Sequence, residues 1–193
     1  LAYLGTSSSW SFARRVLTLT HEQMYREPLP TTGALLFDGS TYDLGWDGLR
    51  TDPNSESPVI PTFDHTMYMI NAVKFRCGQL YHIFDESDFM NRLHEYYTNP
   101  ASTATNGLWY IHFLIILAFG KGFVQQKCHS KTPPGAKLFV KALQLLPDIT
   151  ALMREPIMST EILCCISLYL HSLEFRGCAH NYVLFQSFVE RFS

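Results

Sequence analysis

The pattern of hydrophobic and polar positions changes near residue 62. Gly, Pro, Ser, Thr and Asp dominate up to that point, and five of the ten prolines stand there. Proline fixes its own φ and lacks a backbone donor, so this density predicts an irregular Pro/Gly-rich segment over residues 1–62. The stretch SWSFARRVLTLTHEQMY is the exception, because Trp10, Arg14 and Leu17 recur at helical intervals and predict one short helix.

From residue 63 to residue 193 the hydrophobic period becomes helical. TMYMINAVKFRCGQLYHIF places Ile70, Val73 and the stem of Lys74 on adjacent turns. This segment therefore predicts the first helix of a helical domain over 63–193.

DESDFMNRLHEYYTNP predicts a second, complete helix. Ser87 is the expected N-cap, and Asn99-Pro100 is the expected stop, because proline cannot continue a helix. Between these ends, one face of the predicted helix is apolar and consists of Phe89, Leu93, Tyr96 and Tyr97.

The longest apolar run is LWYIHFLIILAF, from Leu108 to Phe119. It is shorter than the ~20 residues that span a bilayer, and it carries His112. We therefore expect a buried helix, with Asn106 as its N-cap.

Three more segments have helical patterns. GAKLFVKALQLLPDITALM carries an apolar face with Leu138, Ala142 and Leu145. MSTEILCCISLYLHSLEF is expected to be capped by Ser159 or Thr160 and ended by Gly177 in a left-handed conformation. The last segment, AHNYVLFQSFVERF, carries an apolar stripe formed by Phe185, Phe188, Val189 and Phe192.

Strand alternation is sustained nowhere, so the predicted class is all-α. Short loops between successive helices favour an antiparallel helix bundle or a helical-hairpin array. A repeat solenoid is the alternative, although no repeat period is convincing.

Composition narrows the function classes. The chain has 193 residues, of which 47% are hydrophobic and 17% charged, with a net charge of −2. Such a chain can bury a substantial core, and it lacks the basic excess of proteins that hold nucleic acid through phosphates. Arg14-Arg15 is too small a basic patch to hold DNA. Five cysteines without a CxxC pair and no secretory leader favour a reduced compartment, the cytosol or the nucleus.

The serines of YLGTSSSWSF invite a catalytic interpretation. A nucleophile elbow needs a second glycine, but Ser9 occupies that position after Ser7, and no strand is predicted upstream. A phosphate loop would need a lysine, which is missing. We therefore expect a serine-rich turn, including Ser8, that caps the helix starting near Trp10.

Metal binding and acid–base chemistry have weak signals. Cys128-His129 with Cys178 and His180 would be an awkward chelate, and at least one of Cys164 and Cys165 is expected in the core. Four of the eight histidines lie in aromatic-rich segments with a helical pattern, where a core or boundary role is favoured: His82, His94, His112 and His171. Asp85, Glu86 and Asp88 suit a helix N-terminus. Gly120 and Gly122 suit close helix packing or a helix end. We assign no catalytic, cofactor or metal residue.

Taken together, these segments resemble the middle homology region of fungal zinc-cluster transcription factors, also described as the xylanolytic activator regulatory domain. YLGTSSSWSFARRV resembles the family's serine-containing opening, and VKFRCGQLYHIFDESDF resembles its Phe-Asp segment. LWYIHFLIILAFGKGF is similar to its apolar helix ending in Ala-Phe-Gly-Lys. The later GAKLFVKALQLLPDI and MREPIMSTEILCCISLYLHSLEFRGCAHNYV resemble its paired helices, so the likeness runs from about residue 3 to residue 183.

The chain departs from this family in two places. The zinc cluster that reads DNA, normally upstream and cysteine-rich, is not among these residues, so the resemblance implies zinc and DNA contact only through that cluster. After Val183 the family continues with Gly, Ala-x-Arg and Gly-Leu-His, whereas this chain has LFQSFVERFS. We therefore expect a fragment truncated at its C-terminal end, or a gene model that leaves the family's reading at Val183.

The resemblance implies a nuclear, non-enzymatic regulator of RNA polymerase II transcription. Its expected partners are the transcription machinery, other regulatory proteins and a second copy of the chain, with no membrane contact. Two alternatives use the same residues: an α-helical small-molecule or lipid-binding protein, and a helical hydrolase using Ser8 with one histidine. The aromatic side chains are expected to fill the core. If a pocket for an inducer or another ligand exists, it is expected between the helix from Leu108 and the helix from Thr160, the two most apolar.

Overall fold

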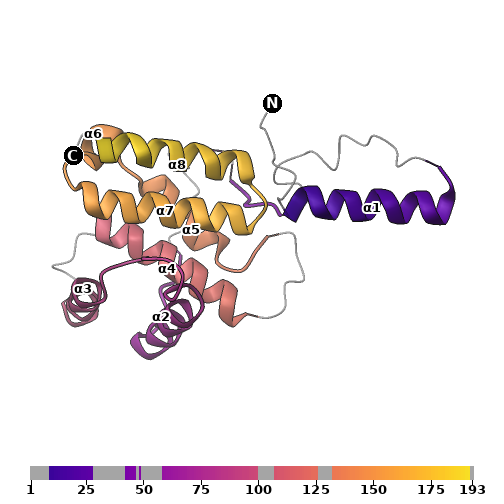
Figure 1. Ribbon diagram of the computed structural model, residues 1–193. Helices are drawn as coiled ribbons and strands as arrows, with labels where there is room; N and C mark the ends of the chain where they lie inside the picture. The colour runs from indigo at the N-terminus through magenta and orange to yellow at the C-terminus, as the bar shows by residue number, and fades with distance from the viewer. Residues whose placement is uncertain are drawn as a thin grey trace. The chain divides into compact units, whose positions relative to one another are not determined.

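The computed structural model describes residues 9–27, 42–46, 48, 58–99, 107–125 and 132–191. Within these ranges the protein forms eight α-helices and no strand, which confirms the all-α class (Figure 1). The chain divides into two compact units, Leu1–Phe37 and Asp38–Ser193.

The first unit contains α1 (Ser9–Tyr25), which covers the stretch where one short helix was predicted. Within α1, Thr20 Oγ1 donates a hydrogen bond to the carbonyl oxygen of Val16 at 2.8 Å. The helix ends where Arg26 takes a positive φ of 55°, and Arg26 N still donates to the carbonyl oxygen of Glu22.

Among the described residues the second unit contains seven helices, and α4 packs most extensively against α2, α5 and α7. In Figure 1, α2 and α3 are viewed almost along their axes, whereas α7 and α8 run across the view side by side. The helices are α2 (Phe63–Cys77), α3 (Glu86–Thr98), α4 (Leu108–Val124), α5 (Ala136–Leu145), α6 (Ile149–Leu152), α7 (Pro156–Ser172) and α8 (Arg176–Arg191).

Helix α4 is the centre of the core, as the uninterrupted apolar run predicted. Every residue from Trp109 to Gly120 is buried, because α4 packs against neighbours on several sides. Asn106, the predicted N-cap, lies outside the described residues, and Gly107 occupies the N-cap position. The predicted apolar positions of α2 are buried too, with Ile70 and Val73 fully inaccessible.

The predicted cap of α3 is wrong by two residues. Asp85 is the N-cap, and its carboxylate accepts a hydrogen bond from Asp88 N at 2.9 Å, so Ser87 lies inside the first turn. The rings of Phe84 and Phe89 stack with centroids 4.4 Å apart, on either side of that cap. Such a hydrophobic staple fixes the entry of a helix and selects Asp85 over Ser87. Asn99 ends α3 as predicted.

Both predicted ends of α7 are also wrong. The helix begins at Pro156 with Glu155 as N-cap, and Ser159 is buried, donating from Oγ to the carbonyl oxygen of Leu152 at 2.8 Å. At the other end the left-handed position is taken by Glu174, with φ 67°. Phe175 N donates to the carbonyl oxygen of Leu170, and Glu174 N donates to that of His171, which together form a Schellman motif. Gly177 therefore lies within α8.

Two other predicted stretches differ in detail. The segment GAKLFVKALQLLPDITALM contains two helices, because α5 ends at Leu145 and α6 begins at Ile149 after Pro147. Asp148 caps α6 by accepting a hydrogen bond from Thr150 N. The predicted stripe at the end of α8 falls on side chains outside the described set: Phe185, Phe188, Val189 and Phe192.

Gly120 lets α4 approach α2 closely. A Cβ atom at this position would lie 2.6 Å from Met69 Cβ, whereas a Cβ at Gly122 would meet only Pro134 O, at 3.9 Å. Gly135 makes a second close approach, because a Cβ there would lie 2.4 Å from Ala118 O. Close packing is thus confirmed for Gly120, whereas Gly122 lies in the last turn of α4 and fits the alternative of a helix end.

Gly120→Ala is expected to lower the free energy of unfolding by about 1–3 kcal/mol, because α2 and α4 must move apart. Gly122→Ala is the matched control in the same helix. It should be neutral or add up to about 1 kcal/mol, since alanine favours helix over glycine. Urea unfolding followed by circular dichroism measures both values, and equal effects of the two substitutions would contradict this role of Gly120.

Candidate functional site

A buried polar cluster joins α4, α7 and the connector between α2 and α3. His112 of α4 and Cys165 of α7 are each 1% exposed, and their Nε2 and Sγ atoms are 3.7 Å apart. Cys165 Sγ also donates to the carbonyl oxygen of Ile83 in the connector at 3.7 Å. Glu161, one turn before Cys165, has its Oε2 atom 3.9 Å from His112 Nδ1.

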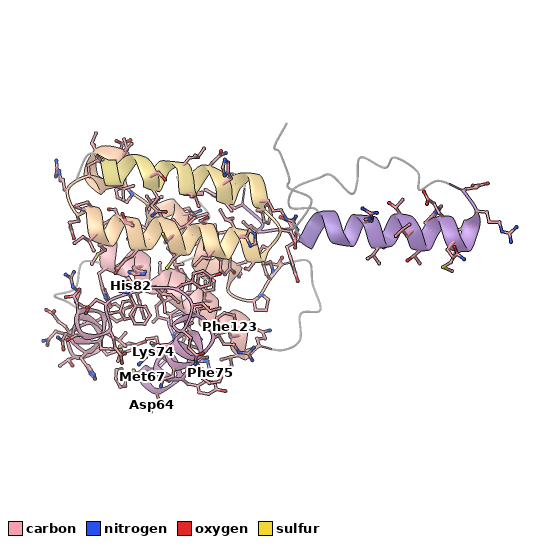
Figure 2. All side chains as sticks on the ribbon, viewed as in Figure 1. Asp64, Met67, Lys74, Phe75, His82 and Phe123 are labelled. Atoms are coloured by element: carbon pink, nitrogen blue, oxygen red, sulfur yellow. The ribbon has the colours of Figure 1, made fainter. Side chains whose placement is uncertain are left out.

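His82, which is labelled in Figure 2, extends this cluster to the surface. Its Nε2 atom is 2.8 Å from Glu161 Oε1, and its side chain is 69% exposed while that of Glu161 is 12% exposed. The carboxylate of Glu161 therefore lies between a buried imidazole and an exposed one. The hydrogen bond from His82 to Glu161 ties the connector to α7.

Burial controls the protonation of the two innermost groups. Desolvation lowers the pKa of His112 to about 4; a hydrogen bond with the backbone of Ile83 opposes this, and the charge of His82 adds to it. Desolvation raises the pKa of Cys165 well above its ordinary value, with smaller contributions from Cys164, Glu161 and Cys77. Both groups are consequently neutral near pH 7.

Cys165, His112 and Glu161 have the order of a nucleophile, a base and an orienting acid. A cysteine nucleophile, however, requires a thiolate and access for its substrate. The Cys165 thiol is buried and its raised pKa disfavours the thiolate. This arrangement satisfies buried polar groups and joins two helices to a connector, which is a structural role.

The two Cys–His pairs that were considered as metal ligands form no metal site among the described residues. Cys128-His129 lies outside the described residues, and Cys178 and His180 lie on α8. Among the described residues no group of three His, Cys, Asp or Glu side chains is arranged to hold a metal ion. No described helix is long and apolar enough to cross a membrane.

The other candidate residues have local roles or lie outside the residues that the structure describes. Ser7 and Ser8 lie outside the described residues, and Ser9 is the first residue of α1. Of the four histidines singled out, His112 alone is buried, so the expected core or boundary position is wrong for the exposed His82, His94 and His171. Cys165 is buried, as expected for at least one of the adjacent cysteines, and Cys164 is half-buried.

The acidic residues at the start of α3 form the contacts that a helix N-terminus favours. Asp85 caps the helix, and Glu86 pairs with Lys74 of α2. Asp88 pairs with Arg92 one turn later, with Nε and Oδ2 3.0 Å apart. Asp85 as the N-cap and Glu86 and Asp88 in the first turn thus lie at the helix N-terminus predicted for them.

Glu161 was not predicted from the sequence, although the geometry places it at the centre of the cluster. A signal existed: Glu161 is the single acidic residue of α7, whose other residues are apolar or small over most of its length. A lone carboxylate in an apolar helix needs a partner, because burying it unpaired is costly. His82 and His112 are the partners that the fold provides.

Two cavities lie near described side chains. The larger, about 520 Å³, is formed by the connector between α2 and α3 and includes Lys74, His82 and Glu86. The smaller, about 200 Å³, lies between the C-terminal ends of α4 and α7 and includes Phe119, Phe123 and Tyr169. The second matches the predicted position of a pocket between these two helices.

Comparison of the chain with protein-family models, curated proteins and solved structures finds no match.

Proposed function

We propose that the chain is the regulatory middle region of a fungal zinc-cluster transcription factor, a nuclear module that modulates transcription by RNA polymerase II. In this proposal it contacts other proteins and does not catalyse a reaction. The proposal rests on the ordered resemblance of its segments to that family. It is compatible with the all-α fold of the described residues and with the neutral, buried state of Cys165 and His112.

One structural observation carries the proposal beyond sequence pattern. Several of the described residues that carry the resemblance lie at contacts between helices. In the Phe-Asp segment, Phe84 and Phe89 staple α3 and pack around His112, with ring centroids 6.3 and 5.7 Å from it. In the Ala-Phe-Gly-Lys segment, Gly120 allows the contact between α4 and α2. A shared family fold would require such residues at such contacts.

A reporter assay in a fungal host tests this function. The chain is placed between an unrelated DNA-binding domain and an activation domain, and reporter output is compared with that of the same fusion lacking it. The proposal expects a change in output that Leu114→Asp abolishes, since the variant cannot fold. Equal output from all three fusions, at equal protein levels, would contradict it.

The chain alone is expected to have no sequence-specific affinity for DNA. Its net charge is −2, and specific recognition needs phosphate contacts to position a reading element. A mobility-shift assay with residues 1–193 at physiological salt measures this. Saturable binding that prefers one sequence over its scrambled version would show that the chain reads DNA itself.

The pocket between α4 and α7 favours a second candidate function, the binding of a small molecule. The two functions are compatible, because a ligand that binds one conformation of a regulatory module shifts its population.

A further inference from the structure

The pocket at the C-terminal ends of α4 and α7 has aromatic and proline walls. Phe119 and Phe123 come from α4, Tyr169 comes from α7, and Pro134 precedes α5. Phe123 is marked near the end of α4 in Figure 2. The side chains lining the pocket are all uncharged. Its walls therefore offer aromatic faces and edges but no ion-pair partner.

These walls are held in place by their own contacts. Tyr169 stacks on Phe139 with ring centroids 4.1 Å apart, and it meets Phe119 edge-on at 5.3 Å. Its hydroxyl donates to the carbonyl oxygen of Pro134 at 3.3 Å. Burial raises the pKa of Tyr169, so this hydroxyl stays protonated and neutral. The pocket is thus preformed, which lowers the entropic cost of binding.

Gly122 contributes to the space. It lies inside α4, where glycine is less favourable than alanine by about 1 kcal/mol. No neighbour excludes a side chain at this position, because a Cβ would meet only Pro134 O, at 3.9 Å. The missing side chain leaves open volume in the pocket that Gly122 lines. A larger residue at this position would fill the pocket without displacing a helix.

We propose that this pocket binds a small, uncharged, single-ring aromatic molecule of the size of phenol. A cavity of ~150 Å³ lined by apolar side chains accommodates benzene, whereas drug-sized ligands need about 300–1,000 Å³. The pocket of about 200 Å³ therefore accommodates one ring with a small substituent. Edge-to-face and offset-stacked contacts with Phe119, Phe123 and Tyr169 favour an aromatic ring over an aliphatic one.

Fluorine NMR with 4-fluorophenol tests the proposal on the full chain. The probe signal is expected to broaden when protein is added, and unlabelled phenol should displace it, whereas cyclohexanol should displace it poorly. The charged probe 4-fluorobenzoate should bind at least about tenfold more weakly at pH 7, because the uncharged lining strips part of the water from its carboxylate and offers it no ion-pair partner.

Gly122→Leu and Gly122→Ala are the matched variants. Leucine should fill the pocket and abolish the broadening, whereas alanine should preserve it. Ser172→Leu fills the same pocket from α7 and decides the question if Gly122→Leu fails to fold. Circular dichroism establishes that each variant used is folded.

Absence of broadening with the folded chain would overturn the proposal, as would equal broadening in both folded leucine variants or equal binding of the two fluorinated probes. The inference does not depend on the proposed role in transcription. A chain that changes reporter output without binding 4-fluorophenol would retain the proposed function and lose only this ligand site.

Discussion

Replacing Leu114 by aspartate is expected to unfold the unit formed by Asp38–Ser193. Leu114 has no exposed surface and lies in the middle of α4, which contacts α2, α5 and α7. The variant loses a buried apolar side chain and forces a carboxylate into the core without a partner. That burial costs several kcal/mol, a large fraction of a typical stability of about 5–15 kcal/mol.

Leu80→Asp is the matched control for this substitution, because Leu80 is 77% exposed in the connector between α2 and α3. It should change the free energy of unfolding by no more than about 0.5 kcal/mol. Far-ultraviolet circular dichroism with thermal melting compares the two. A cooperative melt of Leu114→Asp at the wild-type midpoint would contradict the burial of Leu114.

The sequence predicts the helices well because their hydrophobic periodicity is local. The run from Leu108 to Phe119 has no polar face, so it can only be a buried helix or a membrane segment, and its length argues against the second. The helical spacing of Trp10, Arg14 and Leu17 likewise predicts α1.

Helix ends are predicted less well, since several residues compete for each cap. Asp85 and Ser87 are both good N-cap residues, and the stacking of Phe84 on Phe89 decides between them. Glycine is the usual residue in the left-handed position after a helix, yet Glu174 takes it after α7. The choice follows from the hydrogen bond of Phe175 N to the carbonyl oxygen of Leu170, which sequence alone does not reveal.

The polar cluster could not be predicted, because its members are far apart in sequence. His82 and Glu161 are 79 residues apart, and Cys165 and His112 are 53 apart. Each residue alone gives a weak signal in an apolar or aromatic helix. The pocket between α4 and α7 was predictable in position, because the two most apolar helices must pack together. Its proline wall comes from the turn that starts at Pro133, which periodicity does not describe.

The burial of His112 is expected to make the protein sensitive to mild acid. Its pKa in the folded state is about 4, below the ordinary value of 6.5, because burial disfavours the charged imidazole. Between pH 4 and pH 6.5 the unfolded state therefore binds more protons at His112 than the folded state does. The stabilising contribution is fully present above pH 6.5 and is lost as the pH falls toward 4, by a total of about 3 kcal/mol.

His112→Gln is expected to remove this dependence. Urea unfolding at steps between pH 7 and pH 4.5 should give a wild-type free energy that falls more steeply than that of the variant, by up to about 1.4 kcal/mol per pH unit. His171→Gln is the matched control, since it removes an exposed imidazole from α7 and tests whether loss of any histidine flattens the profile. The other ionisable groups are common to wild type and His112→Gln, so only the difference between their profiles reports on His112. Parallel profiles for wild type and His112→Gln would mean that the imidazole is protonated as readily in the folded protein as in the unfolded chain, and that the Cys165–His112–Glu161 cluster is open to water.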